Sequence, residues 1–92
     1  DVAPPRPRGF LGVRLADADG QVVVTPMKGG PADRAGLRPD DVVLTIDGAR
    51  VPTSEALRTI VSARAPGDVI TVVVRGTDGA LREHRARLAR AP

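Results

Sequence analysis

The sequence predicts a mainly β fold with two helices, in which five to six short strands form a small, partly open barrel or sandwich. Its 92 residues suffice for one domain with one core. Thirteen of them are valine, a β-branched residue that favours strands. The apolar runs are short and separated by turn signals, and only two segments, one short and one longer, carry helix signals. Helices of these lengths would cover the open sides of the sheet.

The first half of the chain predicts an extended lead-in, two strands and a short helix. Residues 1–8 contain three prolines and two arginines, which indicates a linker from an upstream domain. Apolar residues alternate over 11–15 and a valine-rich run covers 21–25, so both are predicted strands, joined by a turn at 17–20. Residues 31–36 begin with proline and end with glycine, which is typical of a one-turn helix.

The second half predicts one longer helix among the remaining strands. Thr53 or Ser54 can cap this helix, and apolar residues at i, i+3 and i+4 continue its buried face to about Arg64. The run 69–74 is apolar on nearly both faces, which indicates a central strand. The other predicted strands are 42–46, a short one around Val51, and 80–88, so that the domain covers residues 9–90 and leaves a tail, 91–92.

Composition disfavours several classes of function. Cysteine is absent, so the chain can hold neither a disulfide nor a thiolate metal site. The formal net charge of +3 arises mainly from thirteen arginines and is a weak sign of nucleic-acid binding. No run approaches the roughly 20 apolar residues that span a bilayer. We therefore expect no cofactor, no nucleic-acid partner and no direct insertion into a membrane.

The residues able to perform catalysis are few and have simpler explanations. A serine hydrolase needs a nucleophile, a base and an orienting acid within hydrogen-bond reach, but the chain has only two serines and one histidine. Ser54 is explained as a helix-start residue, Ser62 as a polar helix residue, and His84 as a surface imidazole between alternating arginines. We expect no catalytic residue, and thus no enzymatic activity of the chain by itself.

The acidic residues do not indicate a metal site. Asp17 and Asp19 lie in the predicted turn, where aspartate hydrogen-bonds its own backbone. Asp40 and Asp41 are adjacent but lack the twelve-residue loop with a terminal bidentate glutamate that an EF-hand needs. We therefore expect no bound metal.

Five motifs in order resemble those of PDZ domains attached to bacterial HtrA-type serine proteases. They are Arg8-Gly9-Phe10-Leu11-Gly12-Val13, Gly-Pro-Ala-x-x-Ala-Gly-Leu at 30–37, Asp41-Val42-Val43, Ile46-Asp47-Gly48 and Pro66-Gly67-Asp68. One departure is Asp40, which stands where these domains usually have glycine. That position must tolerate a turn conformation, and aspartate is among the better non-glycine residues there.

The resemblance implies a site for the end of a peptide. In PDZ domains a loop of the pattern any residue, apolar, Gly, apolar presents backbone N–H groups to a terminal carboxylate, and residues 10–13 match it. Fixed N–H dipoles hold an anion without a charged side chain, and the peptide would add as an antiparallel strand beside the longer helix, 54–64. The implied residues are Phe10, Leu11, Gly12, Val13 and an assisting Arg8 for the carboxylate, Val13, Arg14 and Leu15 for strand pairing, and Leu57, Arg58 and Val61 for the helix wall.

The function implied by this site is capture of C-terminal or exposed hydrophobic peptide segments. The chain would be the substrate-recruiting or regulatory domain of a bacterial envelope protease, in a periplasmic or other extracytoplasmic location. Because no histidine lies near the start of the predicted helix, selection of a serine or threonine two residues before the peptide end is not expected, and the apolar or small residues there favour hydrophobic side chains instead. The expected peptides have hydrophobic end residues. The expected partners are peptide or protein C-termini and an upstream protease domain.

Two alternatives stay open. In a structural or assembly module, the groove would be filled by a neighbouring subunit or by the chain itself, through residues 1–8 or 90–92. The last strand would otherwise bind an anionic surface, but its arginines divide between two faces, which disfavours a continuous basic stripe. Arg85 and Arg87 share one face, and Arg82 and Arg90 point to the other.

Overall fold

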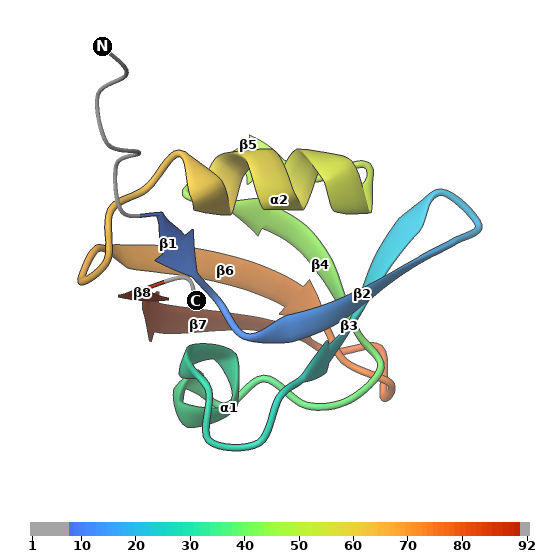
Figure 1. The fold of residues 1–92 in the computed structure, drawn as a ribbon. Helices are drawn as coiled ribbons and strands as arrows, with labels where there is room; N and C mark the ends of the chain where they lie inside the picture. Colours follow the sequence, from blue (N-terminus) through green and yellow to red (C-terminus); the bar gives the residue numbers. More distant parts are fainter. Residues whose placement is uncertain (1–7, 91–92) are drawn as a thin grey trace, which may run out of the picture.

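The computed structural model describes residues 8–90, which form eight strands and two helices (Figure 1). Residues 1–7, most of the predicted linker, and the predicted tail 91–92 lie outside the described residues. In chain order the elements are β1 (Gly9–Phe10), β2 (Val13–Ala18), β3 (Gln21–Pro26), α1 (Pro31–Ala35), β4 (Asp41–Ile46), β5 (Ala49–Arg50), α2 (Ser54–Ser62), β6 (Val69–Arg75), β7 (Leu81–Arg87) and β8 (Ala89–Arg90).

Six strands form one open antiparallel sheet, and two further strands pair beside it. The order along the sheet is β2-β3-β4-β6-β7 with β5 paired to β4, whereas β1 pairs with β8. The sheet does not close into a barrel, so β2 and β7 are its edges within the described part of the chain. The predicted mainly β fold with two helices is confirmed. The predicted central strand is β6, which lies between β4 and β7.

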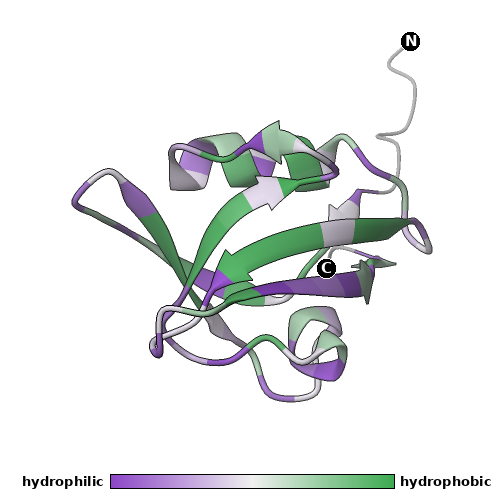
Figure 2. Ribbon diagram, turned by 180° about the vertical axis from the view of Figure 1, so that it is seen from behind, coloured by the Kyte–Doolittle hydropathy of each residue, from purple (hydrophilic) through white to green (hydrophobic). Residues whose placement is uncertain are grey.

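Valine supplies much of the interior, as its abundance predicts. Seven of the fifteen buried hydrophobic residues are valine. Every second residue of β6 is fully buried, and α2 covers the sheet with Leu57 and Val61. Hydrophobic residues run along β4 and β6, while β7 is largely hydrophilic (Figure 2).

Both helices begin and end through the local signals that predict them. Pro31 occupies the first turn of α1, and Gly36 follows its end at a left-handed φ of 100°. The Thr53 hydroxyl accepts a hydrogen bond from the Ala56 N–H at 3.1 Å and caps α2. The helix ends at Ser62, two residues before the predicted end. Thr53, rather than Ser54, is therefore the cap, which leaves Ser54 for another contact.

The first predicted strand, 11–15, is interrupted by a left-handed residue. Gly12 has a φ of 75°, so Leu11 and Gly12 lie outside strands and β2 begins at Val13. At its other end β2 continues to Ala18, and the turn is confined to the next two residues. The prediction that Asp17 belongs to the turn is therefore wrong. An aspartate fits within a strand when its side chain faces solvent, and Asp17 is exposed in β2.

The last predicted strand, 80–88, is also divided. The regular β6–β7 ladder ends at the Val69–Arg87 pair. Beyond it the pairing is irregular: the Leu88 N–H donates to the Asp68 carbonyl at 2.8 Å, and the Leu88 carbonyl accepts from the Gly67 N–H at 2.8 Å. The two residues that follow form β8, and Arg90 is paired with Gly9 of β1. Arg90, part of the segment considered as an alternative groove occupant, is therefore engaged in a strand. The other residues of both candidate segments, apart from Arg8, lie outside the described residues.

His84 is not the surface imidazole that the sequence predicts. Helix α1 packs against β7 and half-buries its ring, and Nδ1 lies 3.1 Å from the Ala35 carbonyl oxygen. Nε2 is buried without a hydrogen-bond partner among the described residues. Arg85 and Arg87 lie on the exposed side of β7, whereas His84 lies on the other side with Arg82 and the buried Ala86.

Two smaller expectations can be compared directly. The short strand predicted around Val51 is β5, which ends one residue earlier, and the Val51 side chain itself enters the core. Asp40 adopts a φ of 68°, the left-handed conformation that its position in the turn was expected to require. Asp40 therefore takes the left-handed conformation just before β4, at the position where the resemblance places glycine.

Candidate functional site

A hollow of about 480 Å³ lies between the edge strand β2 and helix α2. We call it the edge hollow. Nine of the ten residues predicted for the peptide site line it, whereas the tenth, Arg8, is exposed and lies outside its lining. Gly9 and Ser62 line it in addition. The predicted residues that it brings together are Phe10, Leu11, Gly12, Val13, Arg14, Leu15, Leu57, Arg58 and Val61.

The register of β2 decides which of its backbone groups face the edge hollow. Val13 lies opposite Pro26, and the Met27 N–H donates to the Gly12 carbonyl at 2.8 Å. This makes Val13 and Pro26 a non-hydrogen-bonded pair, so the N–H and C=O of Val13 point away from β3. The same alternation directs the groups of Leu15 outward and those of Arg14 toward β3. Of the three residues predicted to pair with a peptide, Val13 and Leu15 have the free backbone groups.

Residues 10–13 form a loop that we call the binding loop. Hydrogen bonds to its carbonyl groups, on the side away from the edge hollow, fix its position. The Leu11 carbonyl accepts from the Ala32 N–H of α1 at 2.9 Å, and the Gly12 carbonyl is taken by Met27. No hydrogen bond within residues 8–90 uses the N–H groups of Leu11 or Gly12. With the outward N–H of Val13, three successive backbone donors remain available at this point of the chain.

The floor of the edge hollow is the hydrophobic core itself. The side chains of Leu11 and Leu57 are 2% exposed and that of Val61 is 6% exposed. Val13 and Leu15 pack partly against the same cluster. Leu11 therefore combines a backbone N–H of the binding loop with a buried side chain, as the alternation of apolar residues over 11–15 predicts. An occupant of the hollow would thus contact apolar surface that the fold already holds rigid.

Gly9 is a site residue that the sequence analysis missed. Its N–H donates to the Arg64 carbonyl at 2.8 Å, which joins β1 to the end of α2. A Cβ atom at Gly9 would lie 2.6 Å from Cδ1 of Leu88 and 3.0 Å from the carbonyl oxygen of Val61. Only glycine permits this approach, and the approach positions the start of the binding loop. The sequence indicated this position through a second glycine, three residues before Gly12.

Asp17, near the end of β2, connects this strand to the start of α2. Its carboxylate accepts hydrogen bonds from the Ser54 N–H at 2.8 Å and from the Ser54 hydroxyl at 2.6 Å. The hydroxyl bond, the N–H bond and the nearby Arg58 hold the pKa of Asp17 below its usual value, against a smaller opposing effect of burial. Strand β2 and helix α2 are therefore tied together by Asp17 at one end and by Gly9 at the other.

The Asp17–Ser54 tie is expected to lose its stabilising effect in acid. Because the pKa of Asp17 is lower in the folded than in the unfolded chain, its contribution is fully present above the unfolded value near 3.8 and disappears as pH falls below it. Urea unfolding at pH 7 should show the Asp17→Asn variant to be less stable than the wild type, with a smaller difference at pH 3. Asp19→Asn is the control, and an Asp17→Asn deficit independent of pH would contradict the assignment.

Neither membrane spanning nor a metal cluster is indicated by the part of the chain that the structure describes. Among residues 8–90, no helix is both long and apolar enough to cross a bilayer. The same residues contain no group of three or more histidine, cysteine, aspartate or glutamate side chains arranged to hold a metal ion.

An open edge strand beside a helix, reached through a glycine-containing loop, defines a small α+β domain of the PDZ type. The model of the PDZ domain family matches residues 9–85, and the chain belongs to this family. The resemblance stated from the sequence motifs is thereby confirmed. The match covers every element described above except β8 and the end of β7.

Proteases dominate the similar proteins. A probable periplasmic serine endoprotease, DegP-like, of Chlamydia trachomatis is 38% identical over an alignment of 82 residues that covers 74% of this chain and 16% of that protein. A probable CtpA-like serine protease of Staphylococcus aureus is 35% identical over an alignment of 72 residues that covers 74% of this chain and 14% of that protein. The solved HtrA-type protease AlgW with decapeptide has a TM-score of 0.84 at 30% identity, over 94% of this chain and 30% of that one. The chain thus spans about one sixth of the length of the curated relatives.

Proposed function

We propose that this domain captures C-terminal or exposed hydrophobic peptide segments by β-strand addition between residues 13–15 and α2. The observation that carries the proposal is the orientation of the β2 edge: the N–H and C=O groups of Val13 and Leu15 face the edge hollow and have no strand partner among residues 8–90. Protein sheets normally protect such edges. An unprotected edge beside an apolar floor suits an extended peptide, which supplies the missing backbone hydrogen bonds.

The binding loop would receive the terminal carboxylate. The N–H groups of Leu11, Gly12 and Val13 are the donors, because the loop's carbonyls are fixed on its far side by Ala32 and Met27. Several oriented N–H dipoles stabilise an anion without a neighbouring charge. Arg8, exposed and outside the lining, would add only long-range attraction, which salt screens.

The apolar floor would select the end residue. Buried Leu11, Leu57 and Val61 hold the floor in place, and the half-buried Phe10, Val13 and Leu15 supply accessible apolar surface. A hydrophobic end residue would therefore gain burial at little cost in ordering the protein. One buried apolar side chain contributes about 1.5–3 kcal/mol, and each backbone hydrogen bond adds a net ~0.5–1.5 kcal/mol. After association costs, we expect a dissociation constant of about micromolar size.

The similar proteins suggest where such capture would be used. The curated relatives are named as serine proteases, some of them periplasmic, and the AlgW structures contain bound peptides. We therefore propose that this chain recruits substrate to, or regulates, an upstream protease domain in the bacterial cell envelope. The chain itself would perform no peptide-bond cleavage, since no triad-like set of side chains occurs among its described residues.

A peptide with a free carboxylate should bind more tightly than its amidated twin. We expect roughly a 10- to 100-fold difference for a peptide ending in a hydrophobic residue, because hydrogen bonds to a charged group contribute about 1.5–3 kcal/mol. Fluorescence anisotropy of a labelled decapeptide measures both affinities. Acetylation of the peptide's amino terminus serves as the control and should change little. Equal affinity of the free and amidated peptides would exclude carboxylate capture.

A further inference from the structure

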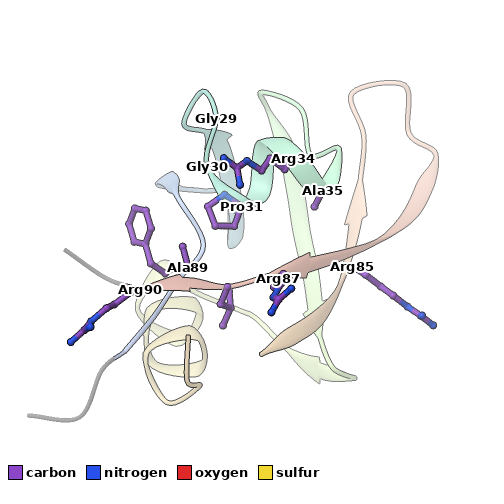
Figure 3. A pocket seen from close by; sticks show the side chains of 11 residues that line it. Gly29, Gly30, Pro31, Arg34, Ala35, Arg85, Arg87, Ala89 and Arg90 are labelled. Atoms are coloured by element: carbon purple, nitrogen blue, oxygen red, sulfur yellow. The ribbon is translucent and has the colours of Figure 1, made fainter. Parts of the chain in front are cut away.

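A second hollow, of about 760 Å³, lies between α1 and the strands β7 and β8, on the side of the molecule opposite α2 (Figures 1 and 3). We call it the arginine hollow. It shares only Phe10 with the edge hollow. The peptide-binding proposal makes no use of it. Its lining residues are Phe10, Gly29, Gly30, Pro31, Arg34, Ala35, Arg85, Arg87, Leu88, Ala89 and Arg90.

Four arginines border this hollow, and the lining contains no acidic residue. In Figure 3, Arg34 from α1 lies beside Pro31 and Arg87 from β7 lies near the centre of the view, whereas the side chains of Arg85 and Arg90 extend outward at opposite ends, away from Pro31. The ion pairs formed within residues 8–90 are Arg64 with Asp47 and Arg82 with Asp78, so none of these four arginines has an acidic partner there.

The prediction that the arginines of the last strand divide between two faces is therefore corrected. Arg82 is indeed separate: its guanidinium donates to Asp78 at 2.6 and 3.1 Å and lowers the pKa of that aspartate to about 2. Arg90 nevertheless joins Arg85 and Arg87, because the chain leaves the β6–β7 ladder at Leu88 and the strict alternation ends there.

The hollow combines this charge with apolar surface. Phe10 is the only aromatic residue of the whole chain, and it lines the hollow together with Pro31, Leu88 and Ala89. Leu88 is buried and fixed, while Phe10 and Pro31 are half-buried. Aromatic residues and arginine are the types enriched at the centres of protein–protein interfaces. A volume of this size accommodates several side chains.

We propose that the arginine hollow binds an acidic segment of another protein chain, in which carboxylates flank an apolar side chain. The guanidinium groups match carboxylates in planar, bidentate geometry, and the apolar side chain would pack on Phe10, Pro31 and Leu88. A free phosphate would leave this apolar surface unused. Single-stranded nucleic acid would need several aromatic rings for stacking, and the chain has one. Charge and apolar surface together therefore favour a peptide.

The test uses peptides that the edge hollow cannot capture by a terminal carboxylate. The probe is acetyl-Asp-Glu-Leu-Glu-Asp-amide, titrated calorimetrically into the 92-residue chain at 50 mM salt. We expect the Arg34→Glu/Arg87→Glu variant to weaken binding at least tenfold. The matched control, Arg38→Glu/Arg50→Glu, has the same net charge change at exposed arginines outside the lining and should weaken binding less than threefold. Replacing the central leucine of the probe by alanine should also weaken binding, and far-ultraviolet circular dichroism verifies that both variants fold.

Three results would overturn the proposal, independently of the function proposed for the edge hollow. They are equal binding of the probe to both double variants, displacement of the probe by a saturating hydrophobic-ended peptide with a free carboxylate, and binding of inorganic phosphate or oligo-dT at least as tight as that of the probe at equal ionic strength. The proposal is supported if the probe binds only where Arg34 and Arg87 are intact, and if that binding survives a filled edge hollow.

Discussion

Replacement of Gly12 by valine is expected to abolish capture of a hydrophobic-ended peptide, weakening it by about a hundredfold or more. Gly12 lies at a φ of 75°, which a β-branched residue avoids at a cost of about 1–3 kcal/mol. Its Cβ would also approach Cδ of Pro31 to 3.1 Å and Cα of Gly30 to 3.4 Å. The contact with Pro31 requires a displacement of a few tenths of an ångström, and the unfavourable φ drives the loop toward another conformation, so we expect the three N–H donors to lose their alignment. Anisotropy with the labelled peptide measures the loss.

A matched glycine separates loss of the binding loop from backbone strain. Gly20 has nearly the same φ, 74°, but no atom lies within 4 Å of the position that its Cβ would take. Gly20→Val should therefore lose similar stability in urea unfolding and retain peptide affinity within about threefold, because its turn lies outside the edge hollow. Unchanged peptide affinity in a folded Gly12→Val variant would show that the loop's N–H groups do not bind the carboxylate.

Replacement of Leu11 by alanine is expected to have the largest effect on stability among the residues of the binding loop. The side chain is 2% exposed within the core cluster, and truncation of such a leucine costs about 2–5 kcal/mol. Urea unfolding followed by circular dichroism measures the loss, since the chain has neither tryptophan nor tyrosine. The backbone N–H of residue 11 remains, so the folded fraction should still prefer a free carboxylate over an amide.

The same truncation at an exposed leucine provides the comparison. Leu81 is 66% exposed, and Leu81→Ala should change the free energy of unfolding by about 0.5 kcal/mol or less. Equal losses at the two positions would mean that Leu11 is not a core residue. Complete loss of carboxylate preference in Leu11→Ala, measured where the variant is fully folded, would assign the side chain a direct part in binding.

The elements of the fold could be predicted because their signals are local. Valine-rich runs mark β3, β4 and β6, and single residues mark the helix ends: Pro31 and Gly36 at α1, Thr53 at α2. Each of these residues determines the start or end of the element in which it lies, so it can be recognised without knowledge of tertiary contacts. The bounds were less accurate where the chain breaks a ladder for a tertiary reason, as it does at Gly12 and at Leu88.

The candidate site could be predicted in part. Both the binding loop and the opposite wall of Leu57, Arg58 and Val61 came from the motif resemblance, whereas helix periodicity alone indicated only a buried apolar face. The Asp17–Ser54 tie spans 37 residues and the His84–Ala35 contact spans 49, so no local pattern announces either of them. The arginine hollow was missed for the same reason: Arg34 reaches it from α1, and Arg90 through a strand break.

The pairing of Gly9 with Arg90 places the two ends of the described domain next to each other, with paired Cα atoms about 5 Å apart. In a longer polypeptide, the chain would enter and leave the domain at neighbouring positions. Tension along such a polypeptide would fall first on the two-residue strands β1 and β8 and on the Gly9–Arg64 bond. Mechanical load would reach the binding loop before it reached the valine core.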